Sequence, residues 1–186
     1  TPAVFSDQLD QAITWTEKAF TFWPDWIQTL RLSFPLNEAT APQSVPGSAD
    51  NIAYGGVQFE LGPDEALTID LKTPVAKYWS FALYDLLWYE SPKFGQRQTS
   101  LNKEQVETVD GKVRIVVAHQ DPGWVNWLDT TGLERGSVAY RYVWAETKPT
   151  PVAKVVQFAD IRIDGNPERR LDQLTKRRLA AQRRFR

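Results

Sequence analysis

The sequence predicts a mainly β fold, an antiparallel β-sandwich or jelly-roll-like domain, with an N-terminal helical arm and a C-terminal amphipathic basic helix. Three observations predict it. Between residues 51 and 163 apolar residues recur with a period of two, which is typical of half-buried strands. Turns, not helices, join these segments, which favours antiparallel pairing over βαβ units. Helical spacing is confined to the two ends, so we expect one domain divided into an arm and loop (1–50), a sandwich (51–163) and a basic helix packed on it (164–186).

The first 50 residues predict two helices and a loop. Ser6 is a suitable N-cap for a helix that opens with Asp7. Pro24 interrupts the pattern because it removes an amide donor and clashes with the preceding turn, so we expect a shorter second helix from Asp25. From 35 to 50 the composition indicates a surface loop. The apolar face of the first helix comprises Leu9, Ala12, Ile13, Thr16, Ala19, Phe20 and Trp23.

The central region predicts a series of short strands. Asp110-Gly111 stands between apolar runs and predicts a hairpin tip, because both central residues of such a turn adopt positive φ. Gly55-Gly56 is interpreted as a turn or bulge. We expect Trp79, Phe81, Leu83, Ile115 and Val117 to share one sandwich core. The predicted strands are 66–72, 78–83, 112–117, 138–144 and 152–163.

The end of the chain predicts a basic helix. Asn166 is placed as its N-cap, Pro167 as its first residue and Glu168 as an acid in its first turn. Residues 168–186 hold eight Lys or Arg and two acids, whereas the chain as a whole has a net charge of −1. We expect this helix to pack on the acidic body through Leu171, Leu174 and Phe185. Nucleic-acid binding is not expected, because the segment is short and lacks interleaved aromatic residues.

The composition excludes several classes of function. The chain has no Cys and one His, so thiol nucleophiles, thiolate metal sites and multi-histidine centres are excluded, and neither a metal nor a cofactor is expected. No nucleotide-binding motif is present. No apolar run is long enough to span a membrane and no signal peptide is recognised, so a soluble protein of undetermined location is predicted. The eight Trp, six Tyr and nine Phe indicate a core of large rings or an aromatic ligand pocket.

Two predicted loops concentrate the polar residues. The segment 119–132 lies between apolar strands and is expected to cross one end of the sheet, where sites commonly lie on rigid β scaffolds. There His119 can act as a base oriented by Asp121, with Asp129 as another acid. The structural alternative is that the Asn and Asp side chains hold turns, the indoles plug the sandwich end and Arg97 pairs with an acid of the other loop. Candidate ligand-binding residues are Arg97, Ser100, Asn102, Trp124, Asn126 and Trp127.

The order of several short motifs resembles the domain of unknown function 1214 family. The resemblance covers roughly residues 55–160 and rests on Asp64-Glu65-Ala66-Leu67, Tyr78-Trp79-Ser80-Phe81, Ser100-Leu101-Asn102, Asp110-Gly111, Asp121-Pro122-Gly123, Asn126-Trp127-Leu128-Asp129, Gly132 and Arg141, with an arginine-rich ending at 169–186. It implies a jelly-roll-like domain of larger bacterial proteins, beside another domain and similar to carbohydrate-active jelly rolls. It adds Arg141 to the ligand-binding candidates. This chain departs from the family where some members carry a His, since it reads Gly132-Leu133-Glu134.

Three functions are compatible with these residues. We expect a binding or accessory module with a polar-aromatic site at one end of the sheets, whose partner is a small molecule or sugar-like ligand, or another domain or protein. One alternative is a small-molecule or glycoside-directed hydrolase or lyase that uses His119 with Asp121 or Asp129. The other is a purely structural interaction domain. A buried polar cleft at the two loops favours the first two, and dispersal of their side chains favours the third.

Overall fold

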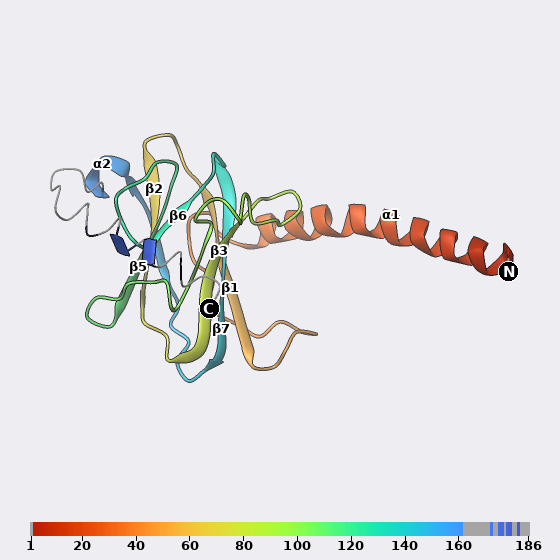
Figure 1. Ribbon diagram of the computed structural model, residues 1–186, viewed down its shortest axis with the longest axis horizontal. Coiled ribbons are helices and arrows are strands. Elements are labelled where there is room, and N and C mark those ends of the chain that lie inside the picture. The colour runs from red at the N-terminus through yellow and green to blue at the C-terminus, as the bar shows by residue number, and fades with distance from the viewer. Residues whose placement is uncertain (1, 162–171, 173–174, 177, 180–181, 183–186) are drawn as a thin grey trace.

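The described residues form a long N-terminal helix, two four-stranded sheets and a short second helix (Figure 1). This computed structural model describes residues 2–161, 172, 175–176, 178–179 and 182. One sheet has the strand order β1-β7-β3-β4 and the other β6-β5-β2-β8, so the predicted mainly β class is confirmed. The elements are α1 (Pro2–Ser33), β1 (Ile52–Glu60), β2 (Glu65–Lys72), β3 (Ala76–Tyr84), β4 (Ser100–Asn102), β5 (Lys112–Ala118), β6 (Trp127–Asp129), β7 (Arg135–Ala145), β8 (Val152–Gln157) and α2 (Phe158–Ile161).

One apolar core lies between the two sheets. Both sheets contribute alternate residues to it, as expected when one face of each strand is buried. Phe81 of β3 stacks on Tyr140 of β7 with ring centroids 5.3 Å apart, and both side chains are buried. All five residues predicted to share a core lie in this cluster, namely Trp79, Phe81, Leu83, Ile115 and Val117. The sandwich-like arrangement predicted from the period-two segments is therefore present.

The strand connections differ in part from the expected hairpins. Asp110 and Gly111 adopt φ of 50° and 68°, which confirms the predicted turn, but only one bridge, between Val109 and Lys112, precedes β5. Strand β5 pairs instead with β2, and on its other side with β6 in parallel, so this sheet is mixed. The predicted loop 119–132 thus contains a strand. This strand, β6, runs beside β5 before the chain enters β7.

Gly55 and Gly56 lie inside β1, and their interpretation as a turn or bulge was wrong. They pair in regular antiparallel register with Tyr140 and Ala139 of β7. A Cβ on Gly55 would lie 2.3 Å from the Tyr140 ring, so only glycine fits beside this large side chain. The Tyr140 hydroxyl passes over Gly55 and donates a hydrogen bond to the carbonyl of Thr40. This bond fastens the segment after α1 along the edge of β1.

The same segment covers the free edge of β1. Isolated bridges join Leu36 to Gln58, Ala39 to Val57 and Gln43 to Tyr54. The Thr40 hydroxyl accepts a hydrogen bond from the Gly56 amide at 3.0 Å. Pairing of this kind satisfies backbone groups that an edge strand would otherwise present to other chains. The loop predicted over 35–50 therefore shields a sheet edge.

The N-terminal helix is one continuous helix, and the predicted break at Pro24 was wrong. It begins at Pro2, a residue favoured in the first turn of a helix, rather than at Asp7. Aromatic contacts bracket Pro24, with Trp23 against Trp26 and Trp26 against Tyr89, and Ile27 is buried on the body. This packing outweighs the loss of one helical hydrogen bond. Figure 1 shows that the N-terminal part of α1 projects away from both sheets, which leaves much of its predicted apolar face exposed.

The end of the body also departs from the prediction. Strand β8 stops at Gln157 instead of residue 163, because Phe158 turns inward onto a second apolar cluster with Ala66 and Val116 and starts α2. The predicted contacts of Leu171, Leu174 and Phe185 lie outside the described residues. So do Asn166, Pro167 and Glu168, predicted to start the basic helix. Within the described part of the chain, no helix combines the length and the apolar character that crossing a membrane requires.

One described contact joins the C-terminal segment to the body. Lys176 Nζ lies 2.6 Å from Glu107 Oε1 of the body and 3.0 Å from Asp172 Oδ2. A lysine of the basic segment thus pairs with a body carboxylate.

Truncation of the core tests the sandwich. Phe81→Ala removes a ring that is fully buried against Tyr140 and Trp79, and we expect it to lower the free energy of unfolding by about 3–5 kcal/mol. Urea denaturation followed by fluorescence measures the change. A loss below about 1 kcal/mol would contradict the core assignment.

The two adjacent glycines of β1 give a matched pair of variants. Gly55→Ala should destabilise the domain by about 1–3 kcal/mol, because its Cβ collides with Tyr140. Gly56→Ala should be neutral or stabilising by up to about 1 kcal/mol, since the nearest atom to its Cβ is the Val138 carbonyl oxygen at 3.4 Å. Thermal and urea unfolding of both variants measures the difference. Equal effects at the two positions would overturn the described register.

Candidate functional site

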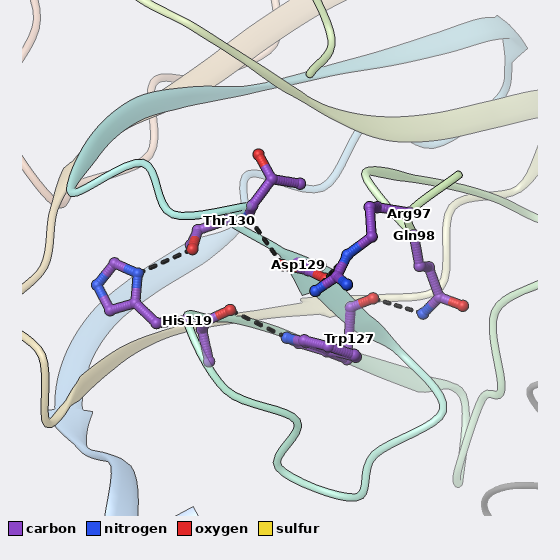
Figure 2. Close-up of polar contacts among 8 residues, drawn as sticks. Arg97, Gln98, His119, Trp127, Asp129 and Thr130 are labelled. Carbon is purple, nitrogen blue, oxygen red and sulfur yellow. Dashed lines mark hydrogen bonds and ion pairs between the residues drawn. The ribbon is translucent and has the colours of Figure 1, made fainter. Parts of the chain in front are cut away.

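The two predicted polar loops meet at one end of the β5-β6 pair. Arg97 lies 2.5 Å from Asp129 Oδ2 through Nη2 and 2.7 Å through Nε, and the Asp129 side chain is 3% exposed (Figure 2). Gln98 donates through Nε2 to the carbonyls of Val125 and Trp127. The amide of Asp129 donates in return to the Gln98 carbonyl. These bonds join the loops directly, as the structural alternative expected for Arg97.

The imidazole of His119 is held by two groups that the sequence did not single out. Nδ1 lies 2.8 Å from the Thr130 hydroxyl (Figure 2). Nε2 lies 3.3 Å from the Leu61 carbonyl. The Asp121 carboxylate accepts a hydrogen bond from the Gly123 amide at 2.7 Å and so closes a turn. His119 and Asp121 are thus each engaged by other groups. A catalytic role for His119 with Asp121 or Asp129 stays a prediction.

Asn126 is the most fully bonded of the predicted ligand-binding residues. Its Oδ1 accepts from the Glu107 amide, and its Nδ2 donates to the carbonyls of Glu107 and Arg114. It is buried, and it joins the segment after β4 to β5. The side chain of Asn102 likewise caps a turn, by accepting from the amides of Glu104 and Gln105.

Both indoles of the predicted site also make backbone hydrogen bonds. Trp124 Nε1 donates to the Ile161 carbonyl at 2.8 Å, and Trp127 Nε1 donates to the Ala118 carbonyl at 3.1 Å. Both rings pack against the second apolar cluster. Ser100 lies in β4, half-buried. The structure brings Arg97 and Asp129 into contact and places Arg141 elsewhere, on β7 in the other sheet.

A cavity of about 440 Å³ lies on the outer face of the sheet β1-β7-β3-β4. Its lining comes from four places: the last turns of α1 with Phe34 just after them, the segment 40–48, the strands β1 and β7, and the segment 84–89. Concave, mainly apolar spaces of this size are typical of small-molecule sites. The described residues that line it are Trp26, Leu30, Phe34, Thr40, Gln43, Val45, Ser48, Tyr54, Gly55, Gly56, Val57, Gln58, Tyr84, Tyr89, Ser137, Ala139, Tyr140 and Arg141.

Strand register explains why the sheet is hollow at this point. Gly56 pairs with Ala139, which pairs in turn with Ala82 of β3, so three small residues form one cross-strand row. They alternate along their strands with core residues, so this row faces outward. The flanking rows each carry two larger side chains and one serine. They comprise Tyr54, Arg141 and Ser80 on one side and Gln58, Ser137 and Tyr84 on the other. A floor of small residues between larger neighbours forms a depression.

Aromatic rings form one wall of the cavity. Tyr84 and Tyr89 stack with centroids 4.4 Å apart and ring planes inclined by 4°, and Trp26 meets Tyr89 edge-on at 5.0 Å. Tyr89 has a φ of 56°, an unfavourable conformation for a residue with a side chain. The Asp85 carboxylate holds its loop by accepting from the amides of Leu87 and Trp88. Strain of this kind persists where the surroundings impose it.

The phenol of Tyr89 remains neutral across the physiological pH range. Burial raises its pKa to about 12 and the adjacent Tyr84 adds to this, while a hydrogen bond with Ser137 and the Arg141 charge oppose it. A neutral phenol donates and accepts hydrogen bonds but supplies no negative charge.

Arg141 is the only charged residue among the described residues that line the cavity. It is half-buried, and its Nη2 lies 3.4 Å from the Tyr84 hydroxyl. Within the described part of the chain, no carboxylate lies within 4.0 Å of its guanidinium. By contrast Arg97, Arg114 and Arg135 each pair with an acid. Arg141 therefore presents an unbalanced positive charge to a mainly apolar cavity.

The aromatic and small residues of this cavity were not identified from the sequence as site residues. A glycine pair inside a strand can mark a place where another group approaches the backbone closely, and this was the available signal. The other lining residues come from segments far apart in the chain, and none forms a local motif.

Comparisons with known proteins identify the family. Residues 55–147 match the model of the family described as "Protein of unknown function (DUF1214)". A crystal structure of an uncharacterized protein from Burkholderia cenocepacia is 32% identical with a TM-score of 0.67, and the match covers 74% of this chain and 39% of that one. The VPA0106 protein from Vibrio parahaemolyticus is 20% identical with a TM-score of 0.48, over 57% and 31% of the two chains.

The chain spans less than two fifths of the length of either solved relative. No protein of curated function matches it. The matched region runs from Gly55 on the cavity floor through the polar loops to the end of β7 and includes Arg141. On this match, which spans half of the chain, the protein belongs to the DUF1214 family.

Proposed function

We propose that this domain is a binding module that takes up a small organic molecule in the cavity on the outer face of β1 and β7. The observation that carries the proposal is a mainly apolar cavity with aromatic walls and one unbalanced charge. This combination of apolar surface with a few convergent polar groups is typical of ligand sites.

The small side chains of the floor support the same conclusion. Gly56 and Ala139 occupy strand positions where β-branched residues are favoured, and glycine inside a strand costs stability. A Cβ on Gly56 would meet no atom closer than 3.4 Å, so packing alone does not require glycine here. Gly55 differs, because Tyr140 excludes any side chain at that position. Space for a ligand accounts for a glycine at position 56 that the fold does not need.

The predicted site at the polar loops remains a separate hypothesis, including a sugar-like ligand held there. Its side chains are engaged by one another and by backbone groups, and buried polar groups satisfied in this way need no ligand. We therefore assign the ligand to the outer-face cavity. We infer that the polar loops have a structural role and hold β4, β5 and β6 together.

Filling the cavity tests the proposed function. Gly56→Val places two methyl groups on the floor, and we expect it to remain folded but to lose the thermal stabilisation given by hits from a set of small aromatic fragments. A ligand at 100 times its Kd adds about 2.7 kcal/mol to stability, which a melting curve resolves easily. Gly95→Val is the matched control, because a Cβ there meets no atom within 4 Å and Gly95 does not line the cavity. Stabilisation that survives in Gly56→Val would refute the assignment.

Two variants test the loops. Asn126→Ala leaves the backbone groups of Glu107 and Arg114 without their partner, and Arg97→Ala leaves the buried Asp129 carboxylate without its cation. We expect each variant to lower the free energy of unfolding by about 1–3 kcal/mol and to retain fragment binding. Urea denaturation and melting curves with fragments measure both effects. Unchanged melting temperatures with lost fragment binding would instead place the ligand at the loops.

A further inference from the structure

Arg141, the charged residue of the cavity lining, indicates the chemical class of the ligand. We propose, building on the proposed function, that the ligand is an organic monocarboxylate with a flat apolar body, and that Arg141 binds its carboxylate. The guanidinium is a planar fork of donors that matches a carboxylate in geometry.

The charge balance favours a monoanion. Arg141 supplies a single positive charge, and the other described lining residues are neutral. One carboxylate neutralises this charge, whereas a phosphate dianion would leave a net negative charge in a mainly apolar space, which is costly. An uncharged ligand would leave the guanidinium without a counter-ion. The phenol of Tyr84, beside the guanidinium, is placed to donate a hydrogen bond to the same carboxylate.

The shape and surface of the cavity favour a flat apolar body. The row of Gly56 and Ala139 adjoins Tyr54 and Arg141 on the sheet, so a group bound to Arg141 extends over a smooth floor. Trp26 and Leu30 of α1, Phe34 just after the helix, and the Tyr84–Tyr89 stack supply apolar and aromatic walls. The volume of about 440 Å³ equals roughly fifteen waters at about 30 Å³ each, which suits a small aromatic acid better than a polymer.

Paired probes that differ only in charge test this inference. The probes are benzoate with benzamide, phenylacetate with phenylacetamide, and glucuronate with glucose, measured by calorimetry on the full 186-residue chain. We expect each aromatic carboxylate to bind at least about tenfold more tightly than its amide, because a charge-assisted hydrogen bond is roughly twice as strong as a neutral one. Glucuronate and glucose should bind weakly. Binding of both sugars more tightly than the aromatic acids would contradict the apolar body.

Variants of Arg141 and Arg135, which both lie on β7, test whether Arg141 binds the carboxylate. Arg141→Met should reduce the affinity for carboxylates to that for amides and leave amide binding unchanged. Arg141→Lys retains the positive charge but lacks the planar guanidinium, so it should bind carboxylates with intermediate affinity. If Arg141→Met does not fold, the affinities of Arg141→Lys test the same contact. Arg135→Met is the control, since Arg135 pairs with Glu60 and does not line the cavity.

The possible failures are distinguishable. Equal affinity for acids and amides, with binding abolished by Gly56→Val and unaffected by Arg141→Met, would overturn the carboxylate assignment and leave the proposed function intact. Absence of binding by all six probes, or binding that persists in Gly56→Val, would overturn both.

Discussion

The contact between Gly55 and Tyr140 is the constraint on which the cavity side of the molecule depends. Tyr140 stacks on Phe81 inside the core and reaches over Gly55 to bond the Thr40 carbonyl. No other residue fits at position 55, because its Cβ would occupy the space of the phenol ring. One side chain thus links the sandwich core to the segment that covers the β1 edge and encloses the cavity. The Tyr140 ring therefore belongs to both the core and the lining of the cavity.

Strand β7 serves both faces of its sheet through simple alternation. Val138, Tyr140 and Tyr142 point into the core, while Ser137, Ala139 and Arg141 point outward under the covering segment. Outward positions of a sheet usually meet water, yet Ser137 is only 7% exposed. The covering segment and the end of α1 create this burial. A second buried environment, the mainly apolar cavity that contains Arg141, therefore lies on the outer face of the same sheet.

The sequence predicts the sandwich well and the cavity poorly, for a physical reason. Period-two alternation around Trp79 and Phe81 and the Asp110-Gly111 turn are local signals, and the structure confirms both. The Arg97–Asp129 pair was also among the expected alternatives. The cavity, however, depends on the register of three strands and on α1, whose segments lie far apart in the chain. The prediction at Pro24 failed for the opposite reason, because a local helix-breaking signal was outweighed by tertiary packing, namely the contact of Trp26 with Tyr89 and the burial of Ile27.

The long projection of α1 has a mechanical consequence. Trp26 lines the cavity, and the same helix continues without a break to Pro2, about 36 Å away at about 1.5 Å per residue. A change of about 5° in its direction at Trp26 would displace Pro2 by about 3 Å on this geometry. Any tilt of α1 at the aromatic wall would therefore be magnified at the N-terminal end of the helix. A tilt of this size would be large enough to measure as a change in distance between a label near Pro2 and one on the sheets.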